Sequence, residues 1–371
     1  MMKKAQLIVD GSERSADLLY GTGFMAADPF IYFHDGEQAG ILVSALEHDR
    51  AKQQVKPGVE VYESTVFSAS RHPADQILAL AAARGIRHFE TPGDFPLQLA
   101  DRLRQDGLTV TPVAGGFFPE RLYKSSAEVM EITLAQQAGE AGYRRARTII
   151  AAAEIGRDDM LYWEGEPLTS ERLRTAIDLE QVKRGALPGG TIVAGGRQGA
   201  EPHNRGNGVL YAHAPIVMDI FPRLQSTGYW GDLTRTLVKG SASGRVRAAF
   251  AAVLDARESA KAALKAGAVP SEIHALAAEI LEKAGFPTWK RPDGRNCGFF
   301  HGLGHGVGLE IHEAPRLSPG NSVPLAGGEV VTVEPGVYDP EWGGMRLEDL
   351  VQVRENGCDC LTTVSTELEI E

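Results

Sequence analysis

Two distant segments of the chain hold the residues with the most informative chemistry. In each, an apolar strand ends on a carboxylate, a turn-rich stretch follows, and the return strand carries a second carboxylate 13 or 14 residues further on; the four acids are Asp219, Asp232, Glu334 and Glu348. An unpaired carboxylate beside a buried strand is costly unless a cation neutralises it. One such acid is equally well explained as a solvent-facing residue or as a partner of Arg235 or Arg346. Four acids in one pattern predict a cation site.

A stretch rich in histidine and glycine lies between the two segments. Three of the ten histidines fall within residues 301–313, at His301, His305 and His312. The glycines around His305 would let the backbone pass close to a ligand or a tight site. A zinc-binding helix with two histidines four apart is not indicated, because the stretch holds four glycines and Gly302 follows His301.

Four carboxylates and one imidazole would balance the charge of two divalent cations. Such oxygen-rich ligation favours manganese, cobalt or zinc over copper. Two metal ions about 3.5–4 Å apart can bridge a water, lower its pKa and stabilise a developing oxyanion. The donor set therefore favours hydrolysis at a two-metal centre.

The elements that must position these residues fall into two regions. Before residue 124, short apolar runs alternate with helical stretches near 46–53, 74–84 and 97–105, which is typical of a layered α/β domain. Ser125 and Glu128 then form a capping-box pattern that opens a long amphipathic helix. We therefore expect one domain over residues 1–123 and a second over residues 124–371.

Long helices dominate the second region, and β-rich, glycine-rich sequence follows each pair of them. The expected helices cover residues 128–155, 170–184, 245–266 and 271–284. Because each carboxylate-bearing segment follows two long helices, the pattern suggests two pseudo-equivalent halves of the helix-helix-hairpin kind. No literal repeat marks this duplication, so it is inferred from the pattern alone.

Composition excludes several other classes of protein. With 371 residues, 43% hydrophobic and 23% charged, the chain is typical of a globular enzyme with more than one core. Its apolar runs are too short for a membrane span or, near the N-terminus, for a secretory leader. A formal net charge of −11 argues against nucleic acid as a principal partner. We expect a cytoplasmic protein with no membrane or nucleic-acid partner.

Four stretches together resemble the pita-bread metallopeptidases, which comprise aminopeptidase P, prolidase and methionine aminopeptidase, with creatinase as a metal-free relative. They are residues 228–236, 301–313, 332–338 and 345–349. The resemblance is close from about Lys124 onwards and looser before it, where the chain is similar to the N-terminal domain of the proline-specific branch. It implies an α/β N-terminal domain followed by an α+β pita-bread catalytic domain.

The resemblance also implies a set of metal ligands, which are Asp219, Asp232, His305, Glu334 and Glu348. Asp219 would bind one ion through both oxygens, whereas Asp232 and Glu348 would bridge both ions. His305 and Glu334 would complete the other site. The implied cofactor is two divalent metal ions per chain, with manganese favoured and cobalt or zinc as alternatives.

Three residues would carry catalysis by the same resemblance. Glu334 would double as general base or proton shuttle, and His203 and His312 would contact the scissile carbonyl and stabilise the tetrahedral intermediate. His203 has a plainer explanation as a solvated residue of the loop at 201–208. Its place ahead of the strand that carries Asp219 favours the functional one.

Three further residues would contact or surround the substrate. His301 would line the pocket for the residue after the cut bond, Arg346 would orient the substrate or support the metal ligands, and Tyr338 would form a pocket wall. The two aspartates of proline-specific members usually stand closer together than the 13 residues seen here, so residues 221–227 would form a longer hairpin tip.

The resemblance implies a metal-dependent peptidase that hydrolyses the bond before proline. It favours a dipeptidase (prolidase) over aminopeptidase P, because compact members of this chain length include many prolidases. The expected partners are a proline-containing di- or oligopeptide and a second copy of the chain in a homodimer. A non-peptidase hydrolase or lyase on the same scaffold stays open, as does a non-catalytic peptide-binding module, although the intact ligand set argues against the latter.

Overall fold

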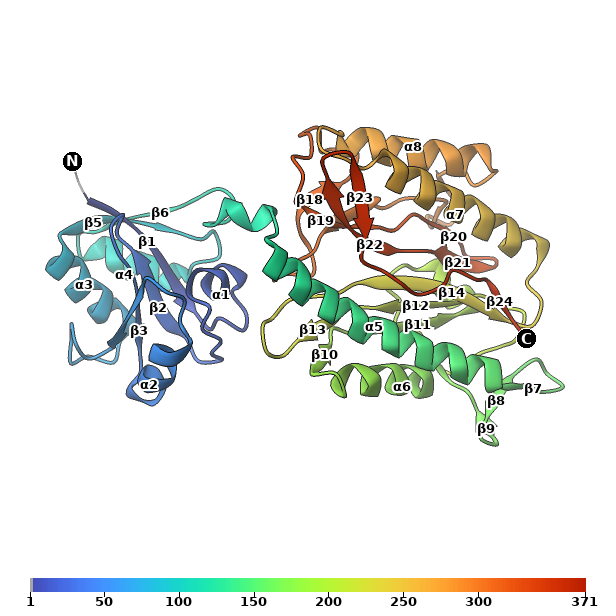
Figure 1. Cartoon of the computed structure of the whole chain (residues 1–371), viewed down its shortest axis with the longest axis horizontal. Helices are drawn as coiled ribbons and strands as arrows, with labels where there is room; N and C mark the ends of the chain where they lie inside the picture. Colours follow the sequence, from blue (N-terminus) through green and yellow to red (C-terminus); the bar gives the residue numbers. More distant parts are fainter. Residues whose placement is uncertain (1–2) are drawn as a thin grey trace. The chain divides into compact units, whose positions relative to one another are not determined.

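The chain divides into two compact units in the computed structural model, which describes residues 3–371 (Figure 1). The units are Met1–Arg121 and Leu122–Glu371. This division falls after Arg121, whereas the sequence places the boundary after Tyr123. Among the described residues, no helix is both long and apolar enough to cross a membrane.

The N-terminal unit is a mixed six-stranded sheet in the order β4-β3-β2-β1-β5-β6. The strands are β1 (Lys3–Asp10), β2 (Phe30–His34), β3 (Ala39–Val43), β4 (Val59–Glu63), β5 (Ile86–Thr91) and β6 (Thr109–Pro112). The helices are α1 (Ala16–Thr22), α2 (Ala45–Gln54), α3 (Pro73–Arg84) and α4 (Leu97–Gln105). The three helices expected from the sequence correspond to α2, α3 and α4.

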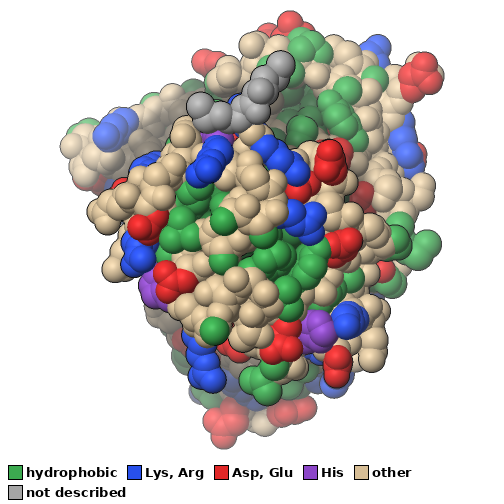
Figure 2. Space-filling model, turned by 90° about the vertical axis from the view of Figure 1, so that its left-hand side faces the viewer, with side chains coloured by type: hydrophobic (Ala, Val, Ile, Leu, Met, Phe, Trp, Pro, Cys, Tyr) green, Lys and Arg blue, Asp and Glu red, His purple; other side chains and the backbone are tan. Residues whose placement is uncertain are grey.

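Both faces of this sheet are covered, because successive strand residues point to opposite sides. Leu7 and Phe33 pack in one apolar cluster with α3 and α4, while Ile8 and Tyr32 pack in another with α1 and α2. The layered α/β prediction for this region is confirmed. On the face drawn in Figure 2, acidic and basic side chains are interspersed with apolar ones rather than gathered by sign.

The second unit contains four long helices, as the sequence predicts. They are α5 (Ser126–Ala152), α6 (Ser170–Val182), α7 (Gly244–Ala263) and α8 (Pro270–Lys283). The capping box at the start of α5 is present, with the Ser125 side chain accepting from the Glu128 backbone and the Glu128 side chain accepting from the Ser125 backbone. Helix α5 ends three residues before Ile155, because the chain enters strand β7 (Glu154–Ile155) there.

Two larger sheets lie between the helix pairs, α7 and α8 on one side and α5 and α6 on the other (Figure 1). The first, β11-β12-β14-β24, contains β11 (Ile192–Gly195), β12 (Ile216–Ile220), β14 (Leu233–Lys239) and β24 (Glu369–Ile370). The second, β18-β17-β19-β22-β23, contains β17 (Gly304–Gly306), β18 (Glu313–Leu317), β19 (Val330–Val333), β22 (Asp349–Arg354) and β23 (Gly357–Cys360).

Short strands complete this unit, as pairs and one small three-stranded sheet. They are β8 (Leu161–Trp163), β9 (Glu166–Pro167), β10 (Ala186–Pro188), β13 (Pro222–Leu224), β15 (Trp289–Lys290), β16 (Asn296–Cys297), β20 (Gly336–Asp339) and β21 (Gly343–Arg346). The two large apolar clusters follow the expected halves. One joins α5 and α6 to β12 and β14, and the other joins α7 and α8 to β19 and β22.

Candidate metal centre

Two antiparallel strand pairs place the four predicted acids. Asp219 lies on β12, and Asp232 immediately precedes β14, which pairs with β12. Glu334 immediately follows β19, and Glu348 immediately precedes β22, which pairs with β19. The acids therefore stand at the ends of paired strands in both halves of the unit, so one end of each pair carries two carboxylates.

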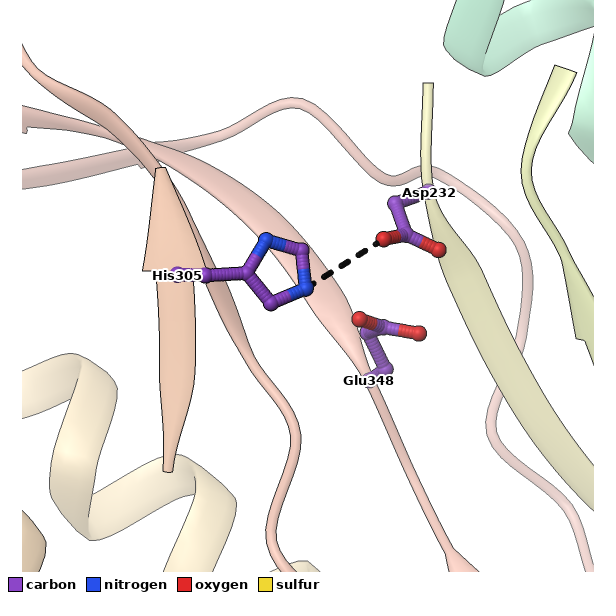
Figure 3. A group of neighbouring side chains, drawn as sticks. All are labelled: Asp232, His305 and Glu348. Atoms are coloured by element: carbon purple, nitrogen blue, oxygen red, sulfur yellow. Dashed lines mark ion pairs between the residues drawn. The ribbon is translucent and has the colours of Figure 1, made fainter. Parts of the chain in front are cut away.

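Asp232, His305 and Glu348 point toward one another and form a compact buried group (Figure 3). One possible ligand atom from each lies within 4.8 Å of the other two. Nε2 of His305 lies 3.6 Å from Oδ2 of Asp232 and 3.3 Å from Oε1 of Glu334. A buried group that combines carboxylates with an imidazole is suited to a divalent metal ion.

Glycine explains how His305 reaches this group. A Cβ on Gly304 would lie 2.0 Å from the carbonyl oxygen of Thr332, and a Cβ on Gly306 would lie 2.2 Å from that of Ala314. Strand β17 pairs with β18 on one side and β19 on the other, so only glycine fits on both sides of the histidine. The predicted role of these glycines, to let the backbone pass through a tight site, is confirmed.

Asp219 has an arginine partner. Its Oδ2 accepts a hydrogen bond from Nη2 of Arg346 at 2.6 Å, and Nη1 of Arg346 donates to the hydroxyl of Tyr338 at 3.0 Å. Arg235 instead donates to the backbone carbonyl of Glu348, and its carboxylate partner is Asp349 at 2.8 Å. Ion pairing with arginine, weighed from the sequence for all four acids, therefore holds for Asp219 alone.

Burial is the main reason that the pKa values of Asp219, Asp232 and Glu348 are raised, and neighbouring carboxylates raise them further. Glu334 behaves differently: burial opposes its ionisation, but the hydrogen bond and charge of His305 lower its pKa to about 2. Three buried acids thus resist ionisation beside Glu334, which ionises readily. Bound positive charge would stabilise the ionised form of all four carboxylates. The donor set therefore fits divalent cations.

One cavity of about 1270 Å³ brings nearly all of the predicted site residues together. Its lining includes His203, Asp219, Asp232, His301, His305, His312, Glu334, Arg346 and Glu348. Tyr338 is not part of the lining: it is 1% exposed, and its hydroxyl lies 2.9 Å from Nε2 of His301. The prediction that Tyr338 forms a pocket wall is wrong, because its ring lies behind the wall and contacts His301 and Arg346 from there.

The histidines of the cavity differ in environment. The rings of His305 and His312 meet edge to face, with centroids 4.3 Å apart. Burial, together with the charges of His305 and Arg316, lowers the pKa of His312 to about 4, so its ring is neutral at pH 7. Burial also lowers the pKa of His301. His203 reaches the cavity from an exposed loop that follows the short helix η2 (Gly196–Ala200).

Two threonines that the sequence analysis did not single out contact the predicted ligands. Oγ1 of Thr234 donates to Oε2 of Glu348 at 2.7 Å, and Oγ1 of Thr332 accepts from the backbone N–H of His305 at 3.1 Å. Each threonine stands two residues from one of the four acids along its strand. Because alternate residues share a strand face, that spacing could have identified both.

The segment at 221–227, expected as a longer hairpin tip, is held by pairing. Strand β13 within it lies antiparallel to β10. Phe221 lines the cavity and packs on Gly189, where a Cβ would lie 2.4 Å from the phenylalanine ring. Phe221 therefore supplies an apolar part of the cavity wall, and the strand that follows it is paired instead of forming a free loop.

Comparison with known proteins identifies the family to which the chain is similar. The model of metallopeptidase family M24 matches residues 131–355. The Xaa-Pro dipeptidase of Pyrococcus furiosus is 38% identical over 48% of this chain, which spans about half of that relative (48%). The Xaa-Pro dipeptidase of Lactobacillus delbrueckii subsp. lactis is 31% identical over 98% of this chain and 90% of the relative.

A solved structure matches the whole chain. The X-Pro aminopeptidase of Thermotoga maritima is similar over 100% of this chain and 98% of its own, with a TM-score of 0.83 and 25% identity. The predicted pita-bread fold is confirmed by this match and by the family model. Because that model covers well over half of the residues and the fold agrees along the full length, the protein belongs to metallopeptidase family M24.

Proposed function

We propose that this protein is a metal-dependent Xaa-Pro dipeptidase, which hydrolyses the peptide bond before proline. The observation that carries the proposal is one cavity whose lining includes all four of the predicted metal-binding acids together with four histidines. Relatives named Xaa-Pro dipeptidase support the substrate class, and membership of a metallopeptidase family supports the use of divalent metal. These relatives are named as peptidases, so they give no support to a non-peptidase enzyme or a non-catalytic binding module.

The proposed metal ligands are Asp219, Asp232, His305, Glu334 and Glu348. Oδ2 of Asp219 already accepts from Arg346, so binding through both oxygens of Asp219 would require that oxygen to be shared. Manganese is favoured over cobalt or zinc, because oxygen donors outnumber nitrogen donors in this set. When bound, two divalent ions would supply an activated water and stabilise negative charge on the carbonyl oxygen.

The chain's own side chains would carry out the remaining steps. Glu334 would accept a proton from the attacking water and pass it to the nitrogen of the leaving proline. His312 would donate its N–H to the carbonyl oxygen, since a neutral imidazole carries one donor. His203 lines the same cavity and would act as a second donor.

Recognition of a free carboxylate would distinguish a dipeptide from a longer peptide. Arg346, which lines the cavity, is already held between Asp219 and Tyr338. Arg316 lines the cavity on β18, opposite His305 in the strand register. A guanidinium can bind a carboxylate through two hydrogen bonds, so we assign this role to Arg316.

The substrate-length comparison tests this proposal directly. Ala-Pro should be cleaved with a kcat/KM much higher than that of Ala-Pro-Ala. Only in the dipeptide does the proline itself carry the free carboxylate. Comparable or reversed values would move the assignment to an aminopeptidase P. Cleavage of neither peptide by the metal-loaded protein would remove it from the proline-specific peptidases.

A pair of variants tests the role of Arg316. Arg316→Met should raise the KM for Ala-Pro and reduce the preference over Ala-Pro-Ala. Arg295→Met is the control, because Arg295 is 59% exposed, pairs with Asp293 and does not line this cavity. Equal effects of the two substitutions would contradict the assignment. A homodimer, which the family resemblance implies, is checked separately by light scattering of the eluted protein.

A further inference from the structure

A buried ion pair connects the start of α5 to the loop that carries His312. Nζ of Lys124 lies 2.5 Å from Oε1 of Glu313, and the two side chains are 2% and 8% exposed. The residues are 189 positions apart in the sequence. Burial of two charges is tolerated only when each neutralises the other, so removing one partner leaves the other uncompensated.

Glu313 lies directly after His312, at the first position of β18. Its carboxylate folds back beneath the preceding loop: a Cβ on Gly308 would lie 2.6 Å from it, and the N–H of Glu310 lies 3.4 Å away. The glycine therefore makes room for the carboxylate inside the loop. The ammonium group of Lys124 therefore pairs with a carboxylate that lies within the loop.

Lys124 is itself fixed to the strands of the catalytic unit. Its backbone N–H donates to the carbonyl of Gly328 at 2.8 Å, and the N–H of Gly328 donates to Val353 of β22 at 2.9 Å. The capping box at Ser125 follows immediately and starts the helix. The ammonium group is thus presented from a rigid part of the backbone.

A second contact holds the same loop from the other half of the unit. The backbone N–H of Trp230 donates to the carbonyl of Gly308 at 2.9 Å, and its indole N–H donates to Leu309 at 3.2 Å. Trp230 stands two residues before Asp232, so the His312 loop lies between an acid-bearing segment and the start of α5.

We propose that Lys124 and Glu313 are positioning residues that hold the His312 loop in place, so that the His312 imidazole stays against His305 and over the cavity. The pair touches none of the proposed metal ligands in the contacts described above, and it would act on turnover through the loop. The activity assay rests on the proposed dipeptidase function, whereas the exchange measurement below does not.

The central experiment compares Lys124→Met with wild type. We expect kcat for Ala-Pro to fall by roughly 10- to 100-fold, because small displacements of a catalytic group cost about this much. KM and metal content should change less than twofold. Backbone amides of residues 307–313 should exchange with deuterium at least tenfold faster, as measured by mass spectrometry.

Lys239→Met is the matched control. Taken as whole residues, backbone included, Lys239 and Lys124 are both 7% exposed, but Lys239 donates to the carbonyl of Ala151 at 2.7 Å, away from the loop. Its replacement should leave kcat and the exchange of residues 307–313 unchanged. A similar fall in kcat in both variants would reduce the role of Lys124 to general stability and overturn the inference.

Further variants separate positioning from folding. Lys124→Arg keeps the cation and should recover most of the lost kcat. Glu313→Gln should lower kcat on its own and add nothing to Lys124→Met in a double-mutant cycle. If Lys124→Met does not fold, Glu313→Gln decides, because it preserves the shape of the side chain: wild-type kcat and wild-type exchange in this variant would refute the pair's role.

The outcomes also separate this inference from the dipeptidase proposal. A wild-type protein that cleaves neither Ala-Pro nor Ala-Pro-Ala refutes the dipeptidase assignment alone, and faster exchange of residues 307–313 in Lys124→Met then still supports the loop contact. Unchanged exchange with unchanged kcat refutes the positioning role, even if Ala-Pro is the substrate.

Discussion

Glu348 and Asp349 are adjacent in the sequence and have opposite surroundings. Glu348 is turned toward the other acids of the candidate metal centre, where burial and neighbouring carboxylates raise its pKa well above the ordinary value. Asp349 is just as buried, but the pKa of its carboxyl group is lowered, because nearby cations outweigh the effect of burial. Those cations, 2.7 to 3.4 Å from its carboxylate, are Arg235, Arg257 and Lys261.

The two residues differ because successive side chains of a strand point to opposite faces. On one face the protein supplies its own cations, from β14 and α7, and the acid is fully paired. On the other face Arg346 is the cation in contact with an acid of the centre, and it pairs with Asp219. A buried carboxylate therefore indicates a metal site only where protein cations do not already neutralise it.

The largest effect is expected from a substitution of Glu348, the acid that faces the candidate metal centre. Glu348→Gln should lower metal content below the proposed two ions per chain and reduce Ala-Pro hydrolysis to the uncatalysed rate, because a proposed oxygen ligand and its charge are lost. Metal analysis by mass spectrometry and the peptidase assay measure both. Full activity in a chelated preparation that is verified to be metal-free would show that the site is assigned wrongly.

Asp349→Asn removes the acid that the protein's own cations neutralise. It leaves three buried cations without their shared acid, so the free energy of unfolding should fall by about 3–5 kcal/mol. Metal content of the folded protein should stay at the wild-type level. Denaturant titration and metal analysis test this; loss of metal comparable to that in Glu348→Gln would mean that the two charge clusters are not separate.

Removing the proposed carbonyl donors should have a smaller effect that spares both clusters. His312→Ala and His203→Ala should each lower kcat by roughly 10²–10³, since a transition-state hydrogen bond is lost. Metal content and the melting temperature should stay close to wild type. Unchanged turnover in both variants would make these histidines ordinary residues of the cavity wall.

The smallest expected effect concerns support of a single ligand. Thr234→Val removes the hydroxyl that donates to Glu348 and should weaken metal affinity by about 10- to 100-fold. Thr191→Val is the control, because the buried Thr191 hydroxyl donates to Asp178 at 2.6 Å, a carboxylate that does not line the cavity. Equal metal affinities of the two variants, measured by calorimetry, would argue against this support.

Local sequence was sufficient to select the candidate ligands and the main elements. An acid at the end of an apolar run is conspicuous because a strand that buries its side chains leaves few places for charge, and this rule selected Asp219 and Glu334. The capping box at Ser125 located the start of α5, because a cap acts within four residues. The glycines on both sides of His305 likewise predicted that neighbouring backbone passes close to this histidine.

Tertiary structure alone decided which charges meet. No spacing along the chain shows that Arg346 pairs with Asp219, that Tyr338 lies behind the cavity, or that Lys124 reaches Glu313 across 189 residues. The strand pattern places Glu348 and Asp349 on opposite faces, but only the packing of α7 determines which face holds the cations. Electrostatic neutralisation depends on distance in space, so it is fixed only when the helices and strands are assembled.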